Sequence, residues 1–444
     1  MSCAGLVPAV ALAERAGLGG LVGQHLSVAG GAGHAAVAKV MSLVAGMVAG
    51  ADSIADMDLL RHGGMGRLFT GVRAPSTLGT FLRACTFGHV RQLDAVAARF
   101  TASLASIAPI IGDADPVAYL DIDDTIRSTH GYAKAGAGYG YSGVKGLNAL
   151  LGAVSTPSSA PVLVGTRLRK GSANSARGAS RFVADAVATT RAAGVGGPIV
   201  VRADSAYYGH AVIGTARRQK VHFSITARQD RAVAAAIADI AEDAWVCIRY
   251  PKAIYDEQLG AWISDAQVAE IPFTAFRSAP KAKQVTARLI VRRVKDANPE
   301  HVSVDAQGEL FAAWRYHAIF TDTPLPTLHA EADHRRHAII EQLIADLKNG
   351  PLAHLPSGDF MANSAWLVLA AIAFNLTRAV GALASIFHAK AATATIRTQL
   401  INVAARITRS ARKNRLRLPA AWPWANQWQR MFTTTTGPPA HPTR

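Results

Sequence analysis

The spacing of apolar residues divides the chain into a helical part and a mixed part. Residues 1 to about 110 carry broad apolar faces at helical spacing, as in "HAAVAKVMSLVAGMVAG" (34–50). From residue 117 short apolar runs predict strands, and amphipathic stretches between the later runs predict helices. The predicted strands are 117–123, 143–155, 160–169, 197–204 and 221–228, and the predicted helices are 180–194 and 209–220. Three early strands followed by alternation with helices predict an α/β fold with a mixed sheet.

A second change of pattern follows residue 230. Four strand-like runs separated by polar turns, at 244–250, 261–273, 284–294 and 309–322, predict a β-rich insertion. Helical spacing resumes at 332–350 and 361–387. The predicted organisation is a helical N-terminal domain (1–110), a core in two parts (111–229 and 331–390), the β-rich insertion between them (230–330) and a basic C-terminal helical region with a tail (391–444). The N-terminal domain fits either a small DNA-end-binding domain or any other all-α accessory domain.

The most apolar run, residues 365–374, favours a buried helix over a membrane helix. It covers about half of a bilayer span, and Asn375 and Arg378 follow it. Three widely spaced cysteines form neither a zinc motif nor a disulfide framework, which fits a reducing compartment. We therefore expect a cytoplasmic protein with no membrane partner.

The net charge of the chain indicates what kind of partner it binds. The 47 Lys and Arg residues against 30 Asp and Glu leave a net charge of +17, which favours a polyanion such as DNA, RNA or a membrane surface. A generally basic soluble protein is the alternative. After Asp359 there is no acidic residue but there are eleven Lys and Arg, seven of them between 397 and 417. If that segment is helical, a phosphate-binding stripe or a solvated face results, comprising Arg406, Arg409, Arg412 and Lys413.

The stretch "YLDIDDTIRS" (119–128) supplies candidate chemistry. Strand alternation places Asp121 and Asp123 on one face, where two like charges are costly unless a cation or a proton offsets them. Two enzyme classes use such a strand. A haloacid dehalogenase-like phosphatase uses Asp-x-Asp-x-Thr as nucleophile and general acid, whereas a metal-dependent nuclease or transposase uses one aspartate as a metal ligand.

Two further acids favour the metal-dependent class. Asp204 ends the apolar run 197–204, and strand ends of an α/β sheet are where ligands gather. Glu341 precedes Lys348 by seven residues, so both lie on one helical face, and His334 and His337 are predicted on it too. A solvated salt-bridging side is the alternative for this face. Acids from distant segments on one sheet edge suit two Mg²⁺ ions about 4 Å apart.

The chain here resembles the DDE transposases of bacterial insertion sequences. The resemblance rests on Asp123 in "DIDDT", Asp204 in "VRADSAYYG" and Glu341 with Lys348 in "IEQLIADLK", and it covers roughly residues 50 to 430. It implies a ribonuclease H-like catalytic core interrupted by a β insertion. Many relatives have Tyr and Arg where this chain has His334 and His337; Arg335 and Arg336 lie beside them as substitute phosphate contacts.

The resemblance also implies an activity and a set of partners. Asp123, Asp204 and Glu341 are expected to hold two Mg²⁺ or Mn²⁺ ions, with Asp121 the alternative to Asp123 as first ligand. The expected reaction is cleavage of transposon ends and their joining to target DNA. The expected partners are double-stranded DNA (terminal inverted repeats and target) and a second copy of the chain on paired ends, in the bacterial cytoplasm near the nucleoid. Expected phosphate contacts are Lys348, Arg167, Arg169 and Lys170 in addition to those named above.

Two alternatives stay open. The phosphatase interpretation is weakened because its paired-acid motif should lie downstream, whereas the nearest match, "GDAD", lies upstream at 112–115. A catalytically inactive DNA-binding protein derived from a transposase is the other alternative, and the presence of all three acids argues against it.

Overall fold

The computed structural model describes residues 1–112, 115–129, 134–140, 142–248, 255–257, 261–262, 266–295, 303–304, 310–311, 314–410 and 413–437. It consists of two compact units. The first contains residues 1–174, 185–197 and 339–444, and the second contains 175–184 and 198–338. Helix α7 (Ala179–Ala192) crosses the division.

The N-terminal part of the first unit is helical, as its apolar spacing predicted. Its elements are α1 (Leu6–Arg15), α2 (Leu18–His25), α3 (Gly30–Gly33), α4 (Ala36–Ala49), the 3₁₀ turns η1 (Ala55–Arg61) and η2 (Met65–Arg67), α5 (Pro75–Arg83) and α6 (Phe87–Ile107). Pro75 opens α5, where its missing N–H costs nothing. A capping box between Thr86 and His89 starts α6.

Four strands follow in the first unit. They are β1 (Ala118–Ser128), β2 (Gly138–Tyr139), β3 (Lys145–Ser155) and β4 (Val162–Lys170). β3 pairs antiparallel with β1, β2 and β4. The predicted strands 117–123, 143–155 and 160–169 are confirmed. β3 is buried along nearly its whole length, which explains its continuous apolar sequence.

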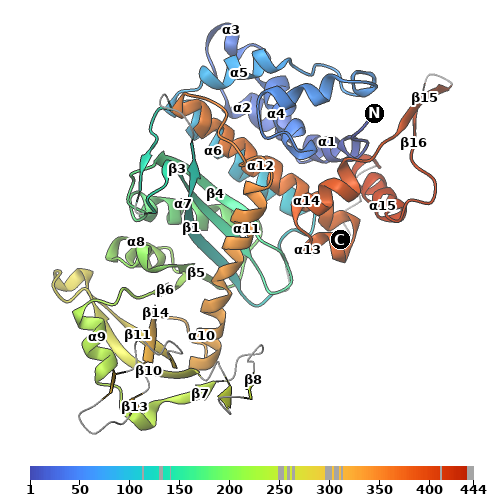
Figure 1. Ribbon diagram of the computed structural model, residues 1–444. Coiled ribbons are helices and arrows are strands. Elements are labelled where there is room, and N and C mark those ends of the chain that lie inside the picture. The colour runs from blue at the N-terminus through green and yellow to red at the C-terminus, as the bar shows by residue number, and fades with distance from the viewer. Residues whose placement is uncertain are drawn as a thin grey trace. The chain divides into compact units, whose positions relative to one another are not determined.

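Helix α12 (Phe360–Ala384) is the core of the first unit. It packs against α1, α4, α5, α6 and β4 (Figure 1). By length and composition it would cross a membrane, but 89% of its most apolar window is buried inside the protein, as predicted for a core helix. The α1–α2 pair passes the same test only as one bent span. The Asn375 amide of α12 bonds both the N–H and the C=O of Leu163 and also Thr101, so it satisfies backbone groups of β4 and ties β4 to α6.

The last part of the first unit differs from its prediction. It contains α11 (Ile339–Lys348), α13 (Ile386–Lys390), α14 (Thr393–Ile396), a π turn (Arg397–Ile401), β15 (Arg406–Ser410), β16 (Lys413–Arg417) and α15 (Ala425–Thr436). The basic segment is therefore an antiparallel hairpin and the predicted helix there is wrong. β-Branched Ile407 and Thr408 favour extended backbone, and Pro419 follows closely. Helices do occur at both ends of the chain.

The second unit holds a mixed sheet. Its strands follow the order β5 (Ile199–Ala203), β6 (His222–Thr226), β14 (Trp314–Thr321), β11 (Val285–Lys295), β10 (Ala266–Ala275) and β7 (Val246–Ile248). β5 and β6 are parallel, and the other pairs are antiparallel. Small two-stranded pieces are β8 (Tyr255–Asp256) with β9 (Ala261–Trp262) and β12 (Ser303–Val304) with β13 (Leu310–Phe311). The α/β class with a mixed sheet and a β-rich insertion is confirmed.

The helices of the second unit interrupt these strands. They are α8 (His210–Arg218), α9 (Arg231–Ala238), α10 (Thr327–Arg335) and the 3₁₀ turns η3 (Ser205–Tyr207), η4 (Glu242–Ala244), η5 (Lys281–Lys283) and η7 (Arg336–Ala338). The single helix predicted over 332–350 is wrong. It is broken at η7, and the division between the units falls directly after Ala338.

Candidate active site

Strand β1 presents different carboxylates on its two faces. Asp121 is fully buried, whereas Asp123 on the same face is only partly buried. Both side chains have interaction partners. A nucleophile or a ligand for an exchangeable ion needs access, so the structure favours Asp123 over Asp121 as the reactive acid.

The opposite face of β1 carries a closed polar triad. Asp124 forms an ion pair with Arg169 of β4 and accepts a hydrogen bond from Asn148 of β3 over 3.0 Å. Arg169 Nε donates to the Asn148 amide oxygen over 2.9 Å. Both charged side chains are nearly inaccessible, at 7% for Arg169 and 6% for Asp124. The prediction that Arg169 contacts DNA phosphates is therefore wrong, because its guanidinium is buried against Asp124.

Helix α11 packs against β1 and places a lysine over the Asp123 face. Burial lowers the pKa of Lys348, the neighbouring Arg127 lowers it further, and Asp123 offsets part of this shift. Arg127 Nε is buried and has no hydrogen-bond partner among the described residues. Sequence reasoning missed Arg127, although alternation along β1 places it on the face of Asp123.

Glu341 lies in the first turn of α11 and is exposed. Its spacing to Lys348 within this ten-residue helix keeps both on one side, as predicted. The predicted continuation of that face to His334 is wrong. His334 belongs to α10, before the helix break, and its ring is buried between Ser224 Oγ and Thr226 Oγ1, each at 2.9 Å.

Asp204 is placed by the second unit. It follows the last residue of β5 and caps η3, where its carboxylate accepts a hydrogen bond from the Ala206 N–H over 3.0 Å. β5 runs parallel to β6, so Asp204 stands at a carboxyl-terminal strand edge, the setting in which α/β sheets bind ligands.

Comparison with known proteins decides the family. A family model for the transposase DDE domain, group 1, matches residues 1–436. The chain belongs to this family. The match covers almost the whole sequence and includes all three candidate acids. No curated protein matches the chain.

Membership in this transposase family excludes the phosphatase interpretation. The structure agrees, because the aspartate that would be the phosphatase nucleophile, Asp121, is fully buried. The family supports DNA as the partner and a nuclease or transposase activity. It also fits a divalent metal: the donor set Asp123, Asp204 and Glu341 is all carboxylate oxygen, which Mg²⁺ and Mn²⁺ prefer. Within the described residues, no preformed cluster of three or more His, Cys, Asp or Glu side chains occurs.

The other basic residues predicted to bind DNA in this transposase have different surroundings. Arg167 pairs with Asp185 at 3.3 Å. Arg335 pairs with buried Glu331 at 2.8 Å, and exposed Arg336 pairs with Asp333 at 2.6 Å. Lys170 is exposed at the end of β4. Arg412 and the Lys413 side chain lie outside the described part of the structure.

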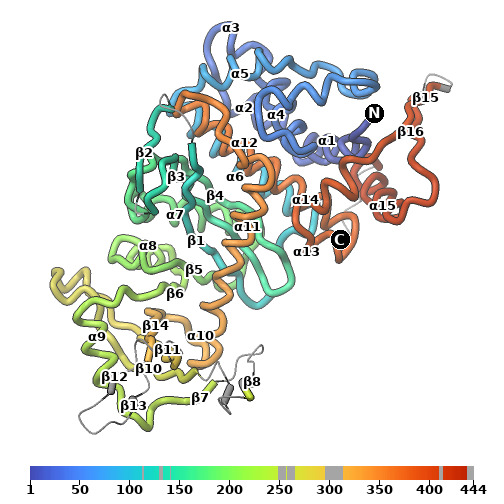
Figure 2. The backbone as a smooth tube through the Cα atoms, viewed as in Figure 1, coloured from blue at the N-terminus to red at the C-terminus, as the bar shows by residue number. Residues whose placement is uncertain are grey.

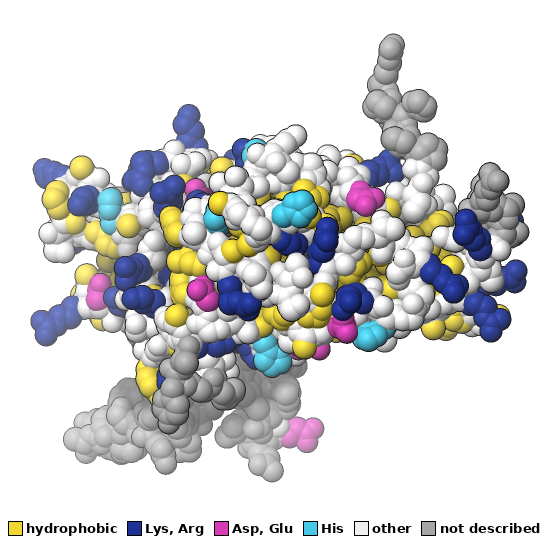
Figure 3. Space-filling model, turned by 90° about the horizontal axis from the view of Figure 1, so that it is seen from above, with side chains coloured by type: hydrophobic (Ala, Val, Ile, Leu, Met, Phe, Trp, Pro, Cys, Tyr) yellow, Lys and Arg dark blue, Asp and Glu magenta, His cyan; other side chains and the backbone are white. Residues whose placement is uncertain are grey.

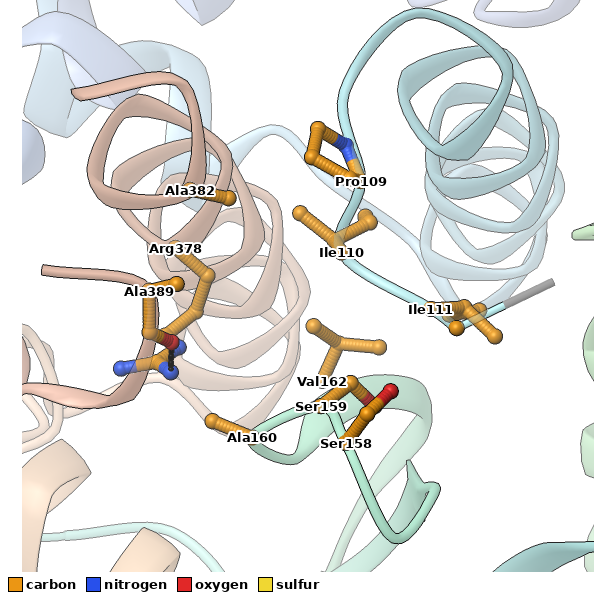
Figure 4. Close-up of a pocket in the computed structure, with 11 residues that line it drawn as sticks. Pro109, Ile110, Ile111, Ser158, Ser159, Ala160, Val162, Arg378, Ala382 and Ala389 are labelled. Atoms are coloured by element: carbon orange, nitrogen blue, oxygen red, sulfur yellow. Dashed lines mark hydrogen bonds between the residues drawn. The ribbon is translucent and has the colours of Figure 1, made fainter. Parts of the chain in front are cut away.

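A cavity of about 180 Å³ lies elsewhere in the first unit (Figure 4). It is lined mainly by apolar and small residues, and none of its lining residues is acidic. Arg378 borders it and donates to the carbonyl oxygens of Ala389 and Ala391. The hydrogen bonds of Arg378 hold the segment after α12 against this helix. No residue of β1 lines the cavity.

Proposed function

We propose that this transposase cuts the ends of a mobile DNA element and joins them to target DNA, with Asp123, Asp204 and Glu341 as ligands of two Mg²⁺ or Mn²⁺ ions. The observation that carries the proposal is the arrangement of α11 over β1, which holds Lys348 beside Asp123 and Arg127. The proposal requires Asp204 of the second unit to meet the other two acids.

The roles of the side chains follow from their charge and burial. Asp123 and Glu341 supply carboxylates on β1 and α11, while Lys348 is a cation near Asp123 and Arg127 is a second cation near Lys348. Asp123 offsets only part of the effect of burial and of Arg127 on Lys348, so we assign these two cations to the phosphate at the cut. When bound, two metal ions would activate the attacking oxygen and stabilise the leaving oxygen. Lys348 and Arg127 would hold the phosphate in line for that attack.

The remaining parts of the proposal concern partners. Lys170, Arg336, Arg406 and Arg409 are exposed cations suited to the DNA backbone. By kinship we further propose a homodimer that pairs two element ends in the cytoplasm. A transposase-derived protein that binds DNA without cutting it is the second candidate.

The experiment compares cleavage by Asp123→Asn, Asp204→Asn and Glu341→Gln with cleavage by the wild type. The substrate is a plasmid carrying this coding sequence with its flanking chromosomal DNA, in Mg²⁺ and in Mn²⁺. Each variant should lose roughly 10²-fold or more in cleavage rate, as when a charge-stabilising group is removed from a transition state. DNA binding should persist.

A charge-matched control is Glu14→Gln, on the exposed side of α1. Cleavage by the three site variants at the rate of this control would refute the metal-ligand assignment. A wild type that binds the plasmid but never cuts it, in either metal, would instead support the inactive alternative.

A further inference from the structure

The hairpin β15–β16 lies beside the N-terminal end of the chain, and both belong to the first unit (Figure 2). The Met1 amino group donates to the Ala405 carbonyl over 2.8 Å, and the Ala405 N–H donates back to Met1 over 2.9 Å. Nearer the hairpin tip, the Asn414 amide donates to the carbonyl of Arg67 over 3.4 Å. The base of the hairpin is thus bonded to Met1, and its second strand is bonded to Arg67.

A glycine permits this close approach. A Cβ atom on Gly64 would lie 2.9 Å from Ile407 Cδ1, closer than side chains normally come. Ile407 and Arg409 lie on one face of β15, and their partners Leu416 and Asn414 lie on the same face of β16. This face is directed at the 63–67 turn.

Two adjoining hollows separate the hairpin from that turn. One, of about 440 Å³, is lined by Arg67, Ile407, Arg409 and Asn414. The other, of about 400 Å³, is lined by Met1, Gly63, Gly64, Arg67, Ala405, Arg406 and Ile407. Because they share Arg67 and Ile407, they form one groove, called here the hairpin groove. None of its lining residues is acidic.

The arginines of the hairpin groove differ from others nearby. Arg67, Arg406 and Arg409 are exposed, and no ion pair to them occurs within the described residues. Arg61, a few residues earlier in the chain, instead pairs with Asp58 at 2.8 Å. Figure 3 shows Lys and Arg side chains at its right-hand edge, the side on which Figure 1 shows the hairpin, as well as elsewhere on this face. Arg67 and Arg409 line the same hollow without a carboxylate, so an anionic ligand there would offset their repulsion.

We propose that the hairpin groove binds the phosphate backbone of duplex DNA, with Arg67 and Arg409 as its principal contacts. This inference rests on the proposed function, in which DNA is the substrate. Guanidinium forks bind phosphate oxygens in pairs, and the Asn414 amide adds a neutral donor. Two adjoining hollows with a shared arginine suit successive phosphates of a polymer better than a single small anion. Arg67 is the unexpected member, because it comes from the N-terminal helical part and lies far from the basic C-terminal segment in sequence.

The test is the salt dependence of binding to a random-sequence duplex, measured in EDTA so that no cleavage occurs. Removing one cation that neutralises a phosphate should reduce the slope of log affinity against log salt by about 0.9. The double variant Arg67→Gln, Arg409→Gln should therefore flatten the slope by roughly 1 to 2 units. The double lysine variant Arg67→Lys, Arg409→Lys should keep most of the slope.

The matched control removes two other exposed cations, Arg415 on the opposite face of the hairpin and Arg430 of α15. Arg415→Gln with Arg430→Gln should change the slope by less than half as much. Equal flattening by both double variants would show a diffuse positive surface and overturn the groove. Asp123→Asn should bind with the wild-type slope, so a failed cleavage test would count against the proposed function alone and a failed slope test against the groove alone.

Discussion

The charges of strand β1 and those of hairpin β15–β16 have opposite surroundings. In β1, Asp124 is buried against Arg169 and Asn148, and Asp123 lies near Lys348 of α11. In the hairpin, Arg406 stands directly opposite Arg417, and Arg415 stands opposite uncharged Thr408. Among the described residues no acid pairs with any of these three arginines.

The difference separates two uses of charge in one protein. Buried pairs hold strands in register and leave nothing free for a ligand, because their desolvation is offset only by each other. Exposed like charges opposite each other destabilise a two-stranded sheet, whose stability in water is already marginal. An anion bound between them reduces this repulsion. A count of basic residues therefore includes Arg169 of β4, whose charge is paired with Asp124, as well as exposed hairpin arginines with which no acid pairs among the described residues.

The largest expected effect comes from breaking the buried pair. Arg169→Met leaves the Asp124 carboxylate buried without its cation, which should lower the free energy of unfolding by about 3–5 kcal/mol. Chemical denaturation measures it. Adding Asp124→Asn to the same protein should recover much of the loss, since it removes the unpaired charge.

The hairpin provides the contrast for that measurement. Arg415→Met should change the free energy of unfolding by no more than about 0.5 kcal/mol, because Arg415 is exposed and no ion pair to it occurs in the described residues. Similar losses for Arg169→Met and Arg415→Met would refute the distinction between the two regions.

The strands of the core could be predicted because burial leaves a clear pattern. β1, β3, β4, β5 and β6 all coincide with runs predicted from apolar spacing, although β1 continues beyond its run. The carboxylates at the ends of such runs could be singled out for the same reason. Alternation along β1 predicts which of them share a face, but the partner that each one meets depends on the register of β1, β3 and β4, and register between distant segments leaves no local signal.

The basic C-terminal segment could not be predicted because charge carries no period of its own. Arg406, Arg409 and Lys413 satisfy helical spacing, yet in the hairpin Arg406 and Arg409 lie on opposite faces. The segment has few apolar residues, chiefly Ile407 and Leu416, so no hydrophobic pattern opposed the helix. The break between α10 and α11 was missed for a related reason, since Arg336, His337 and Ala338 include no helix breaker.

A smaller effect than that of Arg169→Met is expected at Lys348, which is partly buried and lies near both Asp123 and Arg127. Lys348→Met should slow cleavage roughly 10- to 100-fold, the size expected for one hydrogen bond to a charged group. Because burial and Arg127 lower its pKa, Lys348 loses its proton at a lower pH than an ordinary lysine. Its contribution is present below that pKa and is lost as pH rises through it.

The pH profile distinguishes this role from packing. Wild-type cleavage should fall on the alkaline side, and Lys348→Arg, which stays charged, should shift that fall to higher pH. Lys281→Met, an exposed lysine of η5, should leave both the rate and the profile unchanged. An alkaline limb that is the same in the wild type and in Lys348→Arg would exclude Lys348 as the titrating group.

The smallest expected effect concerns the repulsion between Arg406 and Arg417, which destabilises the hairpin. Arg417→Glu replaces a like-charge pair with an attractive one opposite Arg406, which should stabilise the hairpin by roughly 0.2–1 kcal/mol. Amide hydrogen exchange within β15, at Thr408 for example, should slow accordingly. Affinity for duplex DNA should fall at the same time, because one cation is removed and another is paired. Arg417→Gln separates the two contributions: it removes the repulsion without adding attraction, so its exchange rate should lie between those of the wild type and Arg417→Glu. If Arg417→Glu speeds exchange, the repulsion between Arg406 and Arg417 is not what limits this hairpin.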